Sequence, residues 1–272
     1  KIVILGSSTA AGTGASPSSN SWAAKFTSYF NSLSVGNSVD NLAFSGYTTY
    51  NILPTGSTVP SGFTVGTGSN ITAAISRNPC AIIINMPSND EANNISIATQ
   101  QSNWNVIATA AQNANIPIWV TTTQPREWPL TAQGRQNLMT MRDWIITRFG
   151  ANSIDFWTTV ANTDGTVNDI YDSDGVHVNN LGHDLFYNRV RMENIPGTTP
   201  STSNTAPTSN AGSDQTITLP TSSVTLTGSG TDSDGTISSY AWSKVSSLAG
   251  TITSASSAST TITGLAQGTH TF

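Results

Sequence analysis

The most constraining feature of the sequence is a regular alternation between short apolar runs and segments of helical periodicity. Five runs are predicted to be strands: residues 1–5, 38–44, 80–86, 117–122 and 153–157. The segments with helical spacing of apolar residues are 22–30, 71–77, 96–113, 132–149 and 180–193. Strands that alternate with helices through short links favour a parallel sheet covered by helices on both faces. We therefore predict an α/β domain, a three-layer α/β/α sandwich with a five-stranded parallel sheet.

Polar turns follow three of the predicted strands. They are Gly6-Ser7-Ser8-Thr9, the small-residue turn at 45–49, and Pro87-Ser88-Asn89-Asp90. Right-handed crossovers place the carboxyl ends of parallel strands at one edge of the sheet. That edge is where open α/β folds keep their active sites. We therefore expect these three turns to lie close together.

The first turn has several interpretations. A phosphate-binding loop would need a Lys after its last Gly, and none follows Gly12 or Gly14. A dinucleotide-binding loop would need Gly-x-Gly-x-x-Gly directly after the strand, whereas the next Gly after Gly6 is Gly12. Two interpretations remain: a turn that presents a nucleophilic serine, or an ordinary strand-to-loop junction in a Ser-rich protein.

Composition excludes several classes of protein. Only 9% of the residues are charged, and Lys+Arg 10 against Asp+Glu 15 gives a formal net charge of -5. This chain lacks the basic surface of a nucleic-acid binder. No apolar stretch approaches the roughly 18 residues that a membrane span needs. The single cysteine, Cys80, excludes an intramolecular disulfide, and its apolar run predicts a buried thiol that fills space.

A second polar cluster precedes the last predicted helix and contains Asp172, Asp174 and His177. A carboxylate three residues before a His, with Gly175 between them, can accept a hydrogen bond from one imidazole nitrogen and fix the tautomer. The other nitrogen is then free to take a proton from a serine hydroxyl. Together with a serine at a strand end, this loop suggests nucleophilic catalysis.

Four sequence blocks together resemble the SGNH (GDSL-type) hydrolases in order and spacing. The blocks are Gly6-Ser7-Ser8-Thr9, Ala43-Phe44-Ser45-Gly46, Pro87-Ser88-Asn89-Asp90 and Asp174-Gly175-Val176-His177, and the similarity covers residues 1 to about 195. The resemblance implies a flavodoxin-like sheet order and ester hydrolysis through an acyl-enzyme, without cofactor or metal. Two positions depart from the family pattern, because Ser7 stands where an Asp is usual and Pro87 where a Gly is usual.

The resemblance also implies a role for each site residue. Ser8 would be the nucleophile, His177 the general base and then the general acid, and Asp174 the residue that orients the His. The oxyanion hole would consist of the backbone N–H groups of Ser8 and Gly46 and the side-chain amide of Asn89.

Other assignments stay open at this stage. Ser7 could replace Ser8 as nucleophile, and Asn89 could simply form a turn. We expect Asp172 to be a loop acid and His183 to pack on the closing helix or face solvent. An α/β-hydrolase is the nearest rival enzyme, but its serine normally comes well into the chain and its acid lies far from its His.

The composition changes after residue 195, and the domains are predicted to be 1–195, a Pro/Ser/Thr linker at 196–205 and a module at 206–272. Short alternating runs at 216–219, 223–227, 240–242 and 260–263 predict an all-β module, which resembles a PKD-type immunoglobulin-like domain that is incomplete at its C-terminus. Asp232 and Asp234 could bind calcium, although Asp in a strand-joining turn is the simpler interpretation.

The two resemblances together imply a secreted or cell-surface bacterial serine esterase, and we expect it to act as a monomer and to remove acetyl groups from a polysaccharide. Aromatic residues near strand exits, namely Tyr47 and Trp128 and also Trp22, are candidates for stacking on a sugar, and packing is the alternative for each. The alternative functions are a lipase or thioesterase of the same fold that acts on lipid acyl chains, and a binding or adhesion protein without catalysis.

Overall fold

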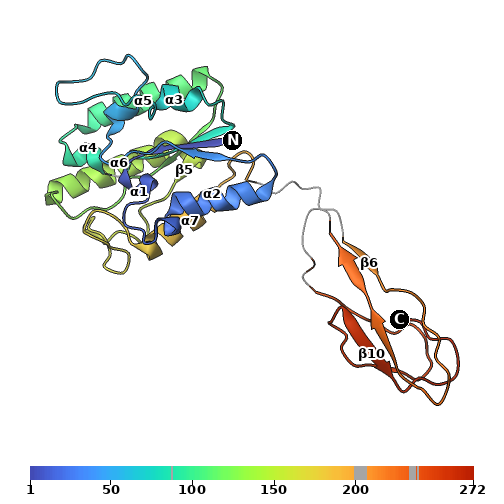
Figure 1. Ribbon diagram of the computed structural model, residues 1–272. Helices are drawn as coiled ribbons and strands as arrows, with labels where there is room; N and C mark the ends of the chain where they lie inside the picture. The colour runs from blue at the N-terminus through green and yellow to red at the C-terminus, as the bar shows by residue number, and fades with distance from the viewer. Residues whose placement is uncertain (87, 199–206, 233–236, 238) are drawn as a thin grey trace. The chain divides into compact units, whose positions relative to one another are not determined.

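The computed structural model describes residues 1–86, 88–198, 207–232, 237 and 239–272. The chain divides into two compact units, Lys1–Pro200 and Ser201–Phe272 (Figure 1), and each is described by itself. No helix in the described ranges is long and apolar enough to cross a membrane. Of the predicted linker at 196–205, residues 199–205 lie outside the described residues, as does Asp234.

The first unit contains a five-stranded parallel sheet. Its strands are β1 (Ile2–Gly6), β2 (Val39–Asn41), β3 (Ala81–Asn85), β4 (Ile118–Thr121) and β5 (Ser153–Ile154), in the order β2-β1-β3-β4-β5. This order and direction confirm the predicted parallel sheet. The strands β2 and β5, which lie at the two edges of the sheet, are shorter than the predicted runs 38–44 and 153–157.

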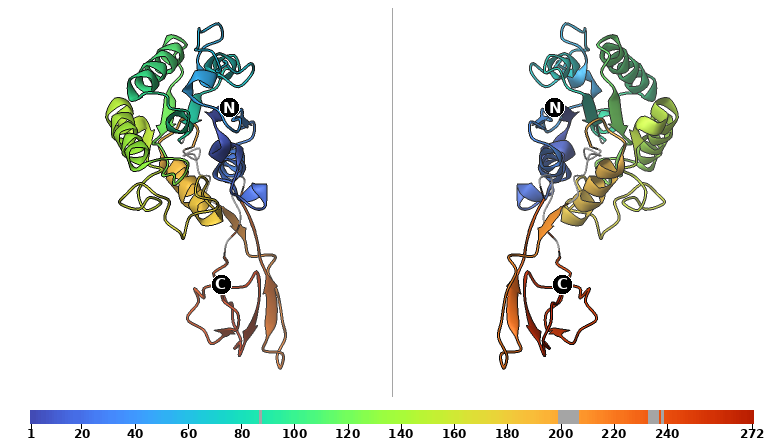
Figure 2. Two further views of the ribbon diagram at one scale, coloured as in Figure 1. Left: turned by 90° about the vertical axis from the view of Figure 1, so that its left-hand side faces the viewer. Right: turned by 90° about the vertical axis from the view of Figure 1, so that its right-hand side faces the viewer.

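Helices cover both faces of the sheet, as two side views show (Figure 2). The α-helices are α1 (Ser8–Ala11), α2 (Trp22–Leu33), α3 (Ile71–Ile75), α4 (Asn89–Ala92), α5 (Ile97–Asn113), α6 (Ala132–Phe149) and α7 (Asn180–Met192). Three short 3-10 helices are η1 (Ser18–Asn20), η2 (Thr49–Ile52) and η3 (Gly150–Asn152). The sequence predicts every long helix, whereas the one-turn helices α1 and α4 were predicted as turns.

Polar side chains fix where the long helices begin. Ser21 accepts a hydrogen bond from the N–H of Ala24 at the start of α2, and Ser96 accepts one from Thr99 at the start of α5. Asn179 accepts from two N–H groups at the start of α7. Such N-caps satisfy amides that have no partner inside the helix and contribute about 1 kcal/mol each.

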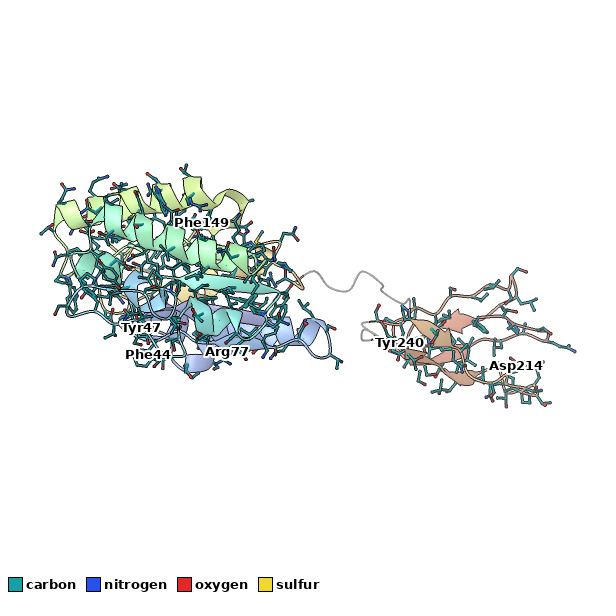
Figure 3. The ribbon with its side chains drawn as sticks, turned by 90° about the horizontal axis from the view of Figure 1, so that it is seen from above. Phe44, Tyr47, Arg77, Phe149, Asp214 and Tyr240 are labelled. Atoms are coloured by element: carbon teal, nitrogen blue, oxygen red, sulfur yellow. The ribbon has the colours of Figure 1, made fainter. Side chains whose placement is uncertain are left out.

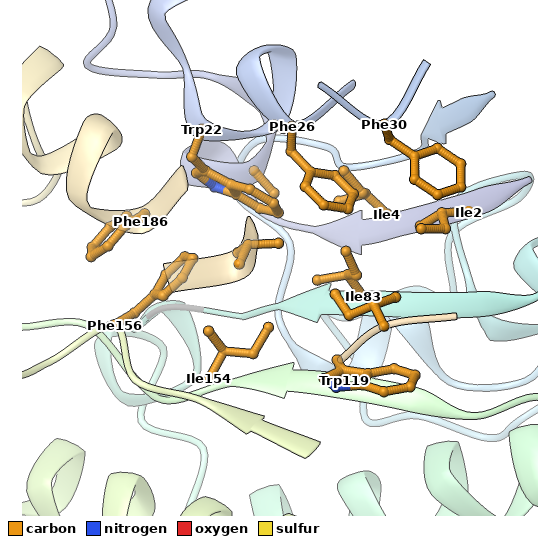
Figure 4. Packing of buried hydrophobic residues seen from close by; sticks show 14 of the residues in the cluster. Ile2, Ile4, Trp22, Phe26, Phe30, Ile83, Trp119, Ile154, Phe156 and Phe186 are labelled. Atoms are coloured by element: carbon orange, nitrogen blue, oxygen red, sulfur yellow. The ribbon is translucent and has the colours of Figure 1, made fainter. Parts of the chain in front are cut away.

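One core lies between the sheet and the pair α2 and α7 (Figure 4). The rings of Phe156 and Phe186 stack with centroids 3.9 Å apart, and Trp22 packs edge-on against Phe156. Trp22 is fully buried. It is therefore a core residue, and the suggestion that it stacks on a sugar is wrong. A second core lies on the opposite face, where α3, α5 and α6 pack on strands β1, β3 and β4.

Cys80 differs from its prediction, because it is exposed. It lies one residue before β3, and its thiol is 3.1 Å from the carbonyl oxygen of Lys1. The apolar residues that follow it are buried because they lie inside the sheet. A residue at the amino end of a strand lies beyond that cover, which the composition of the run does not show.

The second unit is all-β. Its strands are β6 (Thr208–Asn210), β7 (Val224–Thr227), β8 (Ser229–Thr231), β9 (Thr251–Ile252) and β10 (Ser259–Thr263). They form a three-stranded antiparallel sheet, β7-β10-β9, and a separate pair, β6-β8. The predicted strands at 216–219 and 240–242 are absent among the described residues. Leu219 is exposed, so the alternation at 216–219 does not reflect a buried face.

Candidate active site

The strand β1 leads directly into the turn that carries Ser7 and Ser8. A Cβ atom on Gly6 would come within 2.6 Å of the carbonyl oxygen of Asn85 and 2.7 Å of the Cβ of Ala10, so only glycine fits there. This close approach lets α1 begin at Ser8 without a connecting loop. Ser7 is fully buried and Ser8 is 7% exposed, so the two hydroxyls have different access to solvent.

The loop between β5 and α7 places His177 against Ser8. The Nε2 atom of His177 lies 2.8 Å from Ser8 Oγ, and its Nδ1 atom lies 2.8 Å from Asp174 Oδ2. An ionised carboxylate can only accept, so the proton of a neutral imidazole belongs on Nδ1. The lone pair of Nε2 is then directed at the hydroxyl of Ser8. The structure therefore brings together Ser8, His177 and Asp174.

Asp174 holds the loop as well as the imidazole. Its Oδ1 atom accepts hydrogen bonds from the N–H groups of Val176 and His177, at 3.0 and 2.8 Å. Partial burial would raise the pKa of Asp174, but the hydrogen bonds from His177 and Val176 favour the charged form and hold that pKa below its usual value. The carboxylate is therefore ionised at neutral pH.

Asp172 and His183 lie outside this chain of hydrogen bonds. Asp172 accepts from the N–H groups of Asp174 and Gly175, so it braces the same turn from the other side and is a loop acid. His183 is fully buried on α7, where Nδ1 accepts from the N–H of Trp22 and Nε2 lies 3.0 Å from the carbonyl oxygen of Thr13. Burial lowers the pKa of His183, so it is a neutral packing residue.

Asn89 is the first residue of α4 and connects three segments. Its Nδ2 atom donates to Ser7 Oγ at 2.7 Å and to the carbonyl oxygen of Tyr47 at 3.0 Å. Gly46 lies in the exposed turn beside Tyr47 with a φ of 85°, a conformation that favours glycine. The Asn89 amide thus contacts Ser7 and Tyr47, the sequence neighbours of Ser8 and Gly46, at the carboxyl ends of β1 and β2. Pro87 lies outside the described residues.

The sequence analysis missed a role for Asp90, which is buried beside Asn89. Its carboxylate accepts from the N–H of Thr49 at 3.1 Å and from the Thr49 hydroxyl at 2.5 Å, and Asn103 donates to that hydroxyl. Burial raises the pKa of Asp90 to about 6, although the hydrogen bonds from Thr49 favour its charged form. Asp90 therefore anchors η2, which follows the Gly46 turn, to the start of α4.

The loop 124–129 between β4 and α6 forms another side of the site. The N–H of Glu127 donates to the carbonyl oxygen of Gly175, and the indole Nε1 of Trp128 donates to the carbonyl oxygen of Asp174. A Cβ on Gly175 would come within 2.8 Å of that indole nitrogen. Trp128 nevertheless remains 59% exposed.

Aromatic residues also follow β2. Phe44 is 59% exposed, and its ring centroid lies 5.0 Å from that of the partly buried Tyr47 (Figure 3). Tyr47 packs against the second core and against Gly66. Phe44 is the more accessible ring of the pair, which the sequence pattern did not distinguish. No cluster of three or more His, Cys, Asp or Glu suited to a metal ion occurs in the part of the chain that the structure describes.

Solved structures show the same fold as the first unit. A GDSL-like lipase from Bacteroides thetaiotaomicron is 18% identical, with a TM-score of 0.52, and the match covers 70% of this chain and 85% of that one. An acetyl xylan esterase is 12% identical, with a TM-score of 0.53 and coverage of 70% and 96%. A mutant of an acetyl-xylooligosaccharide esterase from Geobacillus is 12% identical, with a TM-score of 0.52 and coverage of 71% and 92%.

Family models identify both parts of the chain. A comparison with curated proteins finds no match. A PKD domain model matches residues 211–272 and confirms the assignment of the C-terminal module. The model of the GDSL-like Lipase/Acylhydrolase family matches residues 4–185, which include Ser8, Asn89, Asp174 and His177. The chain therefore belongs to the GDSL-like lipase/acylhydrolase family.

Proposed function

We propose that the protein is a secreted serine esterase with Ser8 as nucleophile, and that it removes acetyl groups from a polysaccharide. The observation that carries the proposal is the unbroken chain from Asp174 through His177 to Ser8, with both outer contacts at 2.8 Å. These distances lie within hydrogen-bond reach for a nucleophile, its base and the group that orients the base.

The reaction follows from this geometry. As Ser8 Oγ attacks the ester carbonyl carbon, its proton passes to Nε2 of His177, and the resulting imidazolium is stabilised by Asp174. The negative charge that forms on the carbonyl oxygen is stabilised by the N–H groups of Ser8 and Gly46 and by the amide of Asn89. When the tetrahedral intermediate collapses, His177 donates the proton to the leaving alcohol. Water, deprotonated by His177, then hydrolyses the acyl-enzyme and restores the Ser8 hydroxyl.

Two features support a sugar as the alcohol part of the ester. Trp128 and Phe44 expose flat aromatic faces next to elements of the site, and such faces pack well on the apolar face of a sugar ring. Two proteins of the same fold are named as acetyl xylan and acetyl-xylooligosaccharide esterases. We assign Trp128 to direct contact with substrate and Tyr47 to a supporting contact through Phe44.

The appended PKD domain supports an extracellular location. We propose a secreted monomer that needs no cofactor. Size-exclusion chromatography with light scattering tests the oligomeric state, and a dimer mass at micromolar concentration would contradict it.

The first experiment measures p-nitrophenyl acetate hydrolysis by the wild type, Ser8→Ala and Ser7→Ala. We expect a loss of several orders of magnitude for Ser8→Ala only. An active Ser8→Ala variant would refute the assignment of the nucleophile. An inactive wild type would favour a binding or adhesion role.

A second experiment addresses the substrate. Rates that fall sharply from acetyl to octanoyl esters support deacetylation, whereas rates that rise with chain length support a lipase or thioesterase. On an acetylated xylan we expect Trp128→Ala to lose about tenfold in kcat/KM. The same variant should lose less on p-nitrophenyl acetate, which has no sugar to stack, because only the hydrogen bond from the indole to Asp174 is then missing.

A further inference from the structure

Arg126 is a buried cation close to the site for which the reaction scheme gives no role. It lies in the loop 124–129 and is only 9% exposed. Its guanidinium forms no ion pair with a carboxylate among the described residues. Burial of a charged guanidinium costs free energy unless its N–H groups have hydrogen-bond acceptors. The groups that accept those donors therefore indicate what the residue does.

The acceptors lie beside the proposed oxyanion hole. Nη1 of Arg126 donates to Asn89 Oδ1 at 3.1 Å and to Ser88 Oγ at 3.3 Å, and Nε donates to the carbonyl oxygen of Trp128 at 2.8 Å. A guanidinium has donors and no acceptor. It can therefore face the oxygen of the Asn89 carboxamide but not its NH₂ group.

The other end of the carboxamide faces acceptors. Nδ2 of Asn89 donates to the carbonyl oxygen of Tyr47, which cannot donate, and to Ser7 Oγ. Turning the carboxamide by 180° would set donor against donor at Arg126 and acceptor against acceptor at Tyr47. Arg126 and Tyr47 together thus permit one orientation, with the NH₂ group next to the residue that precedes the nucleophile.

We propose that Arg126 is a positioning residue for ester hydrolysis, which holds the Asn89 carboxamide with its NH₂ group on the side of Ser7 and Ser8, so that the N–H that donates to Ser7 Oγ can turn to the oxyanion when the ester binds. The inference rests on the proposed function, in which Asn89 donates to that oxyanion. The positive charge against Oδ1 also polarises the amide and strengthens its N–H donors as negative charge develops on the substrate. No contact between Arg126 and substrate is required.

The same loop touches the other half of the site. Glu127 and Trp128 donate to the carbonyl oxygens of Gly175 and Asp174, on the loop that carries His177. Removing Arg126 could in principle act through that loop instead of through Asn89. The two routes predict different results when substitutions are combined. Only the route through Asn89 disappears when residue 89 has no amide.

The test is a double-mutant cycle on p-nitrophenyl acetate with Arg126→Met, Asn89→Ala and both together. We expect Arg126→Met to lower kcat by about 10- to 100-fold with KM changed less than about threefold, since only the transition state carries the charge. Asn89→Ala should lower kcat by about 10²- to 10³-fold. Adding Arg126→Met to Asn89→Ala should then cost less than about threefold more.

Two further variants serve as controls. Arg189 is partly buried and also donates to backbone carbonyls, those of Asp155 and Thr158, so Arg189→Met removes a comparable guanidinium away from Asn89. Its kcat should match that of the wild type. Arg126→Lys keeps a cation with fewer donors and should fall between wild type and Arg126→Met. If Arg126→Met does not fold, Arg126→Lys with and without Asn89→Ala gives the same cycle.

The proposal would be overturned if the loss in kcat of the double variant equalled the product of the two single losses. A wild-type kcat for Arg126→Met would overturn it as well. Ser8→Ala separates this failure from failure of the proposed function. If Ser8→Ala abolishes hydrolysis while Arg126→Met does not affect it, only the role of Arg126 is refuted. If Ser8→Ala remains active, the proposed function fails first.

Discussion

Two segments at the site each contribute an aspartate, and the two carboxyl groups are held in opposite ways. Asp174 lies on the loop 172–178, its side chain is 49% exposed, and hydrogen bonds hold its pKa below the usual value. Asp90 lies at the start of α4, is buried, and has its pKa raised to about 6. Both accept a backbone N–H, so the difference arises from the deeper burial of Asp90 and from the imidazole of His177 beside Asp174.

This contrast separates two tasks that a carboxylate can perform. An acid that orients a histidine must stay charged at neutral pH, and contact with water keeps the charge favourable. An acid that ties backbone segments together needs only its lone pairs, which the neutral form also supplies. We therefore expect Asp174 to affect the reaction and Asp90 to affect folding.

The largest expected effect is that of Asp174→Asn on turnover. The amide cannot stabilise the imidazolium and favours the wrong tautomer of His177, so kcat should fall about 10³- to 10⁴-fold. The thermal midpoint should change little, because the side chain is half exposed. Steady-state kinetics with p-nitrophenyl acetate and a melting curve measure both.

Asp172→Asn is the matched control, because Asp172 braces the same turn without touching the imidazole. Its loss in kcat should stay below about tenfold. Equal losses for the two variants would show that the loop, and not the orienting carboxylate, limits the reaction.

The next effect concerns pH and stability. A folded pKa raised from 3.8 to about 6 means that the stabilising contribution of Asp90 is complete below pH 3.8 and is lost as pH rises through about 6. At about 1.4 kcal/mol per pKa unit, a difference of about two units corresponds to about 3 kcal/mol at neutral pH. Urea unfolding of the wild type and Asp90→Asn between pH 4 and 7.5 measures it.

Relative to Asp90→Asn, the wild type should lose stability as pH rises over that range. Asp174 and the other acids with lowered pKa act in the opposite sense but are common to both proteins, so they cancel in the difference. A difference that does not depend on pH would contradict the contrast between the two aspartates.

A smaller effect is expected from deleting the Asp90 carboxyl at pH 5, where it is protonated in the folded protein. Asp90→Ala leaves the buried N–H of Thr49 without its acceptor, which should cost about 2 kcal/mol in the free energy of unfolding. The experiment is urea unfolding at that pH, with Asp90→Asn as the variant that keeps an acceptor. Equal stability of the Ala and Asn variants would show that the Thr49 contact contributes nothing.

The smallest expected effect is that of Ser7→Ala. Ser7, like Asp90, is a buried hydrogen-bonding residue beside the site. The substitution removes one acceptor from the Asn89 amide and leaves the contacts to Arg126 and Tyr47. We expect kcat to fall about three- to tenfold, much less than for Ser8→Ala. A loss as large as that of Ser8→Ala would assign Ser7 to the chemistry itself.

The sequence predicted the sheet, the long helices and the Asp174-to-His177 loop because each depends on local spacing. The helix α6 has the predicted bounds, 132–149. The hydrogen-bonded pair Asp174 and His177 is three residues apart, so a motif can specify it. The strands of the second unit were predicted less well, because alternation alone does not show burial: Leu219 in the run 216–219 is exposed and lies in no strand, whereas Ile262 in β10 is fully buried.

Contacts between distant residues were not predictable in this way. Thr49 and Asp90 are 41 positions apart, and Asn89 and Arg126 are 37 apart. Neither pair has a spacing that sets it apart from other polar residues in loops. Only the fold brings the members of each pair together. Only their burial in the folded protein shows that these polar groups must use each other as hydrogen-bond partners.

The distance along the chain between Ser8 and His177, 169 positions, has a consequence for biosynthesis. The proposed nucleophile is synthesised among the first residues of the first unit, and its proposed base is synthesised close to the end of that unit. His177 lies on the loop that leads into α7, which begins three residues later. If Ser8 and His177 act as proposed, a nascent chain carries an inert serine, and we expect hydrolysis to begin only after the loop that carries His177 has folded against β1.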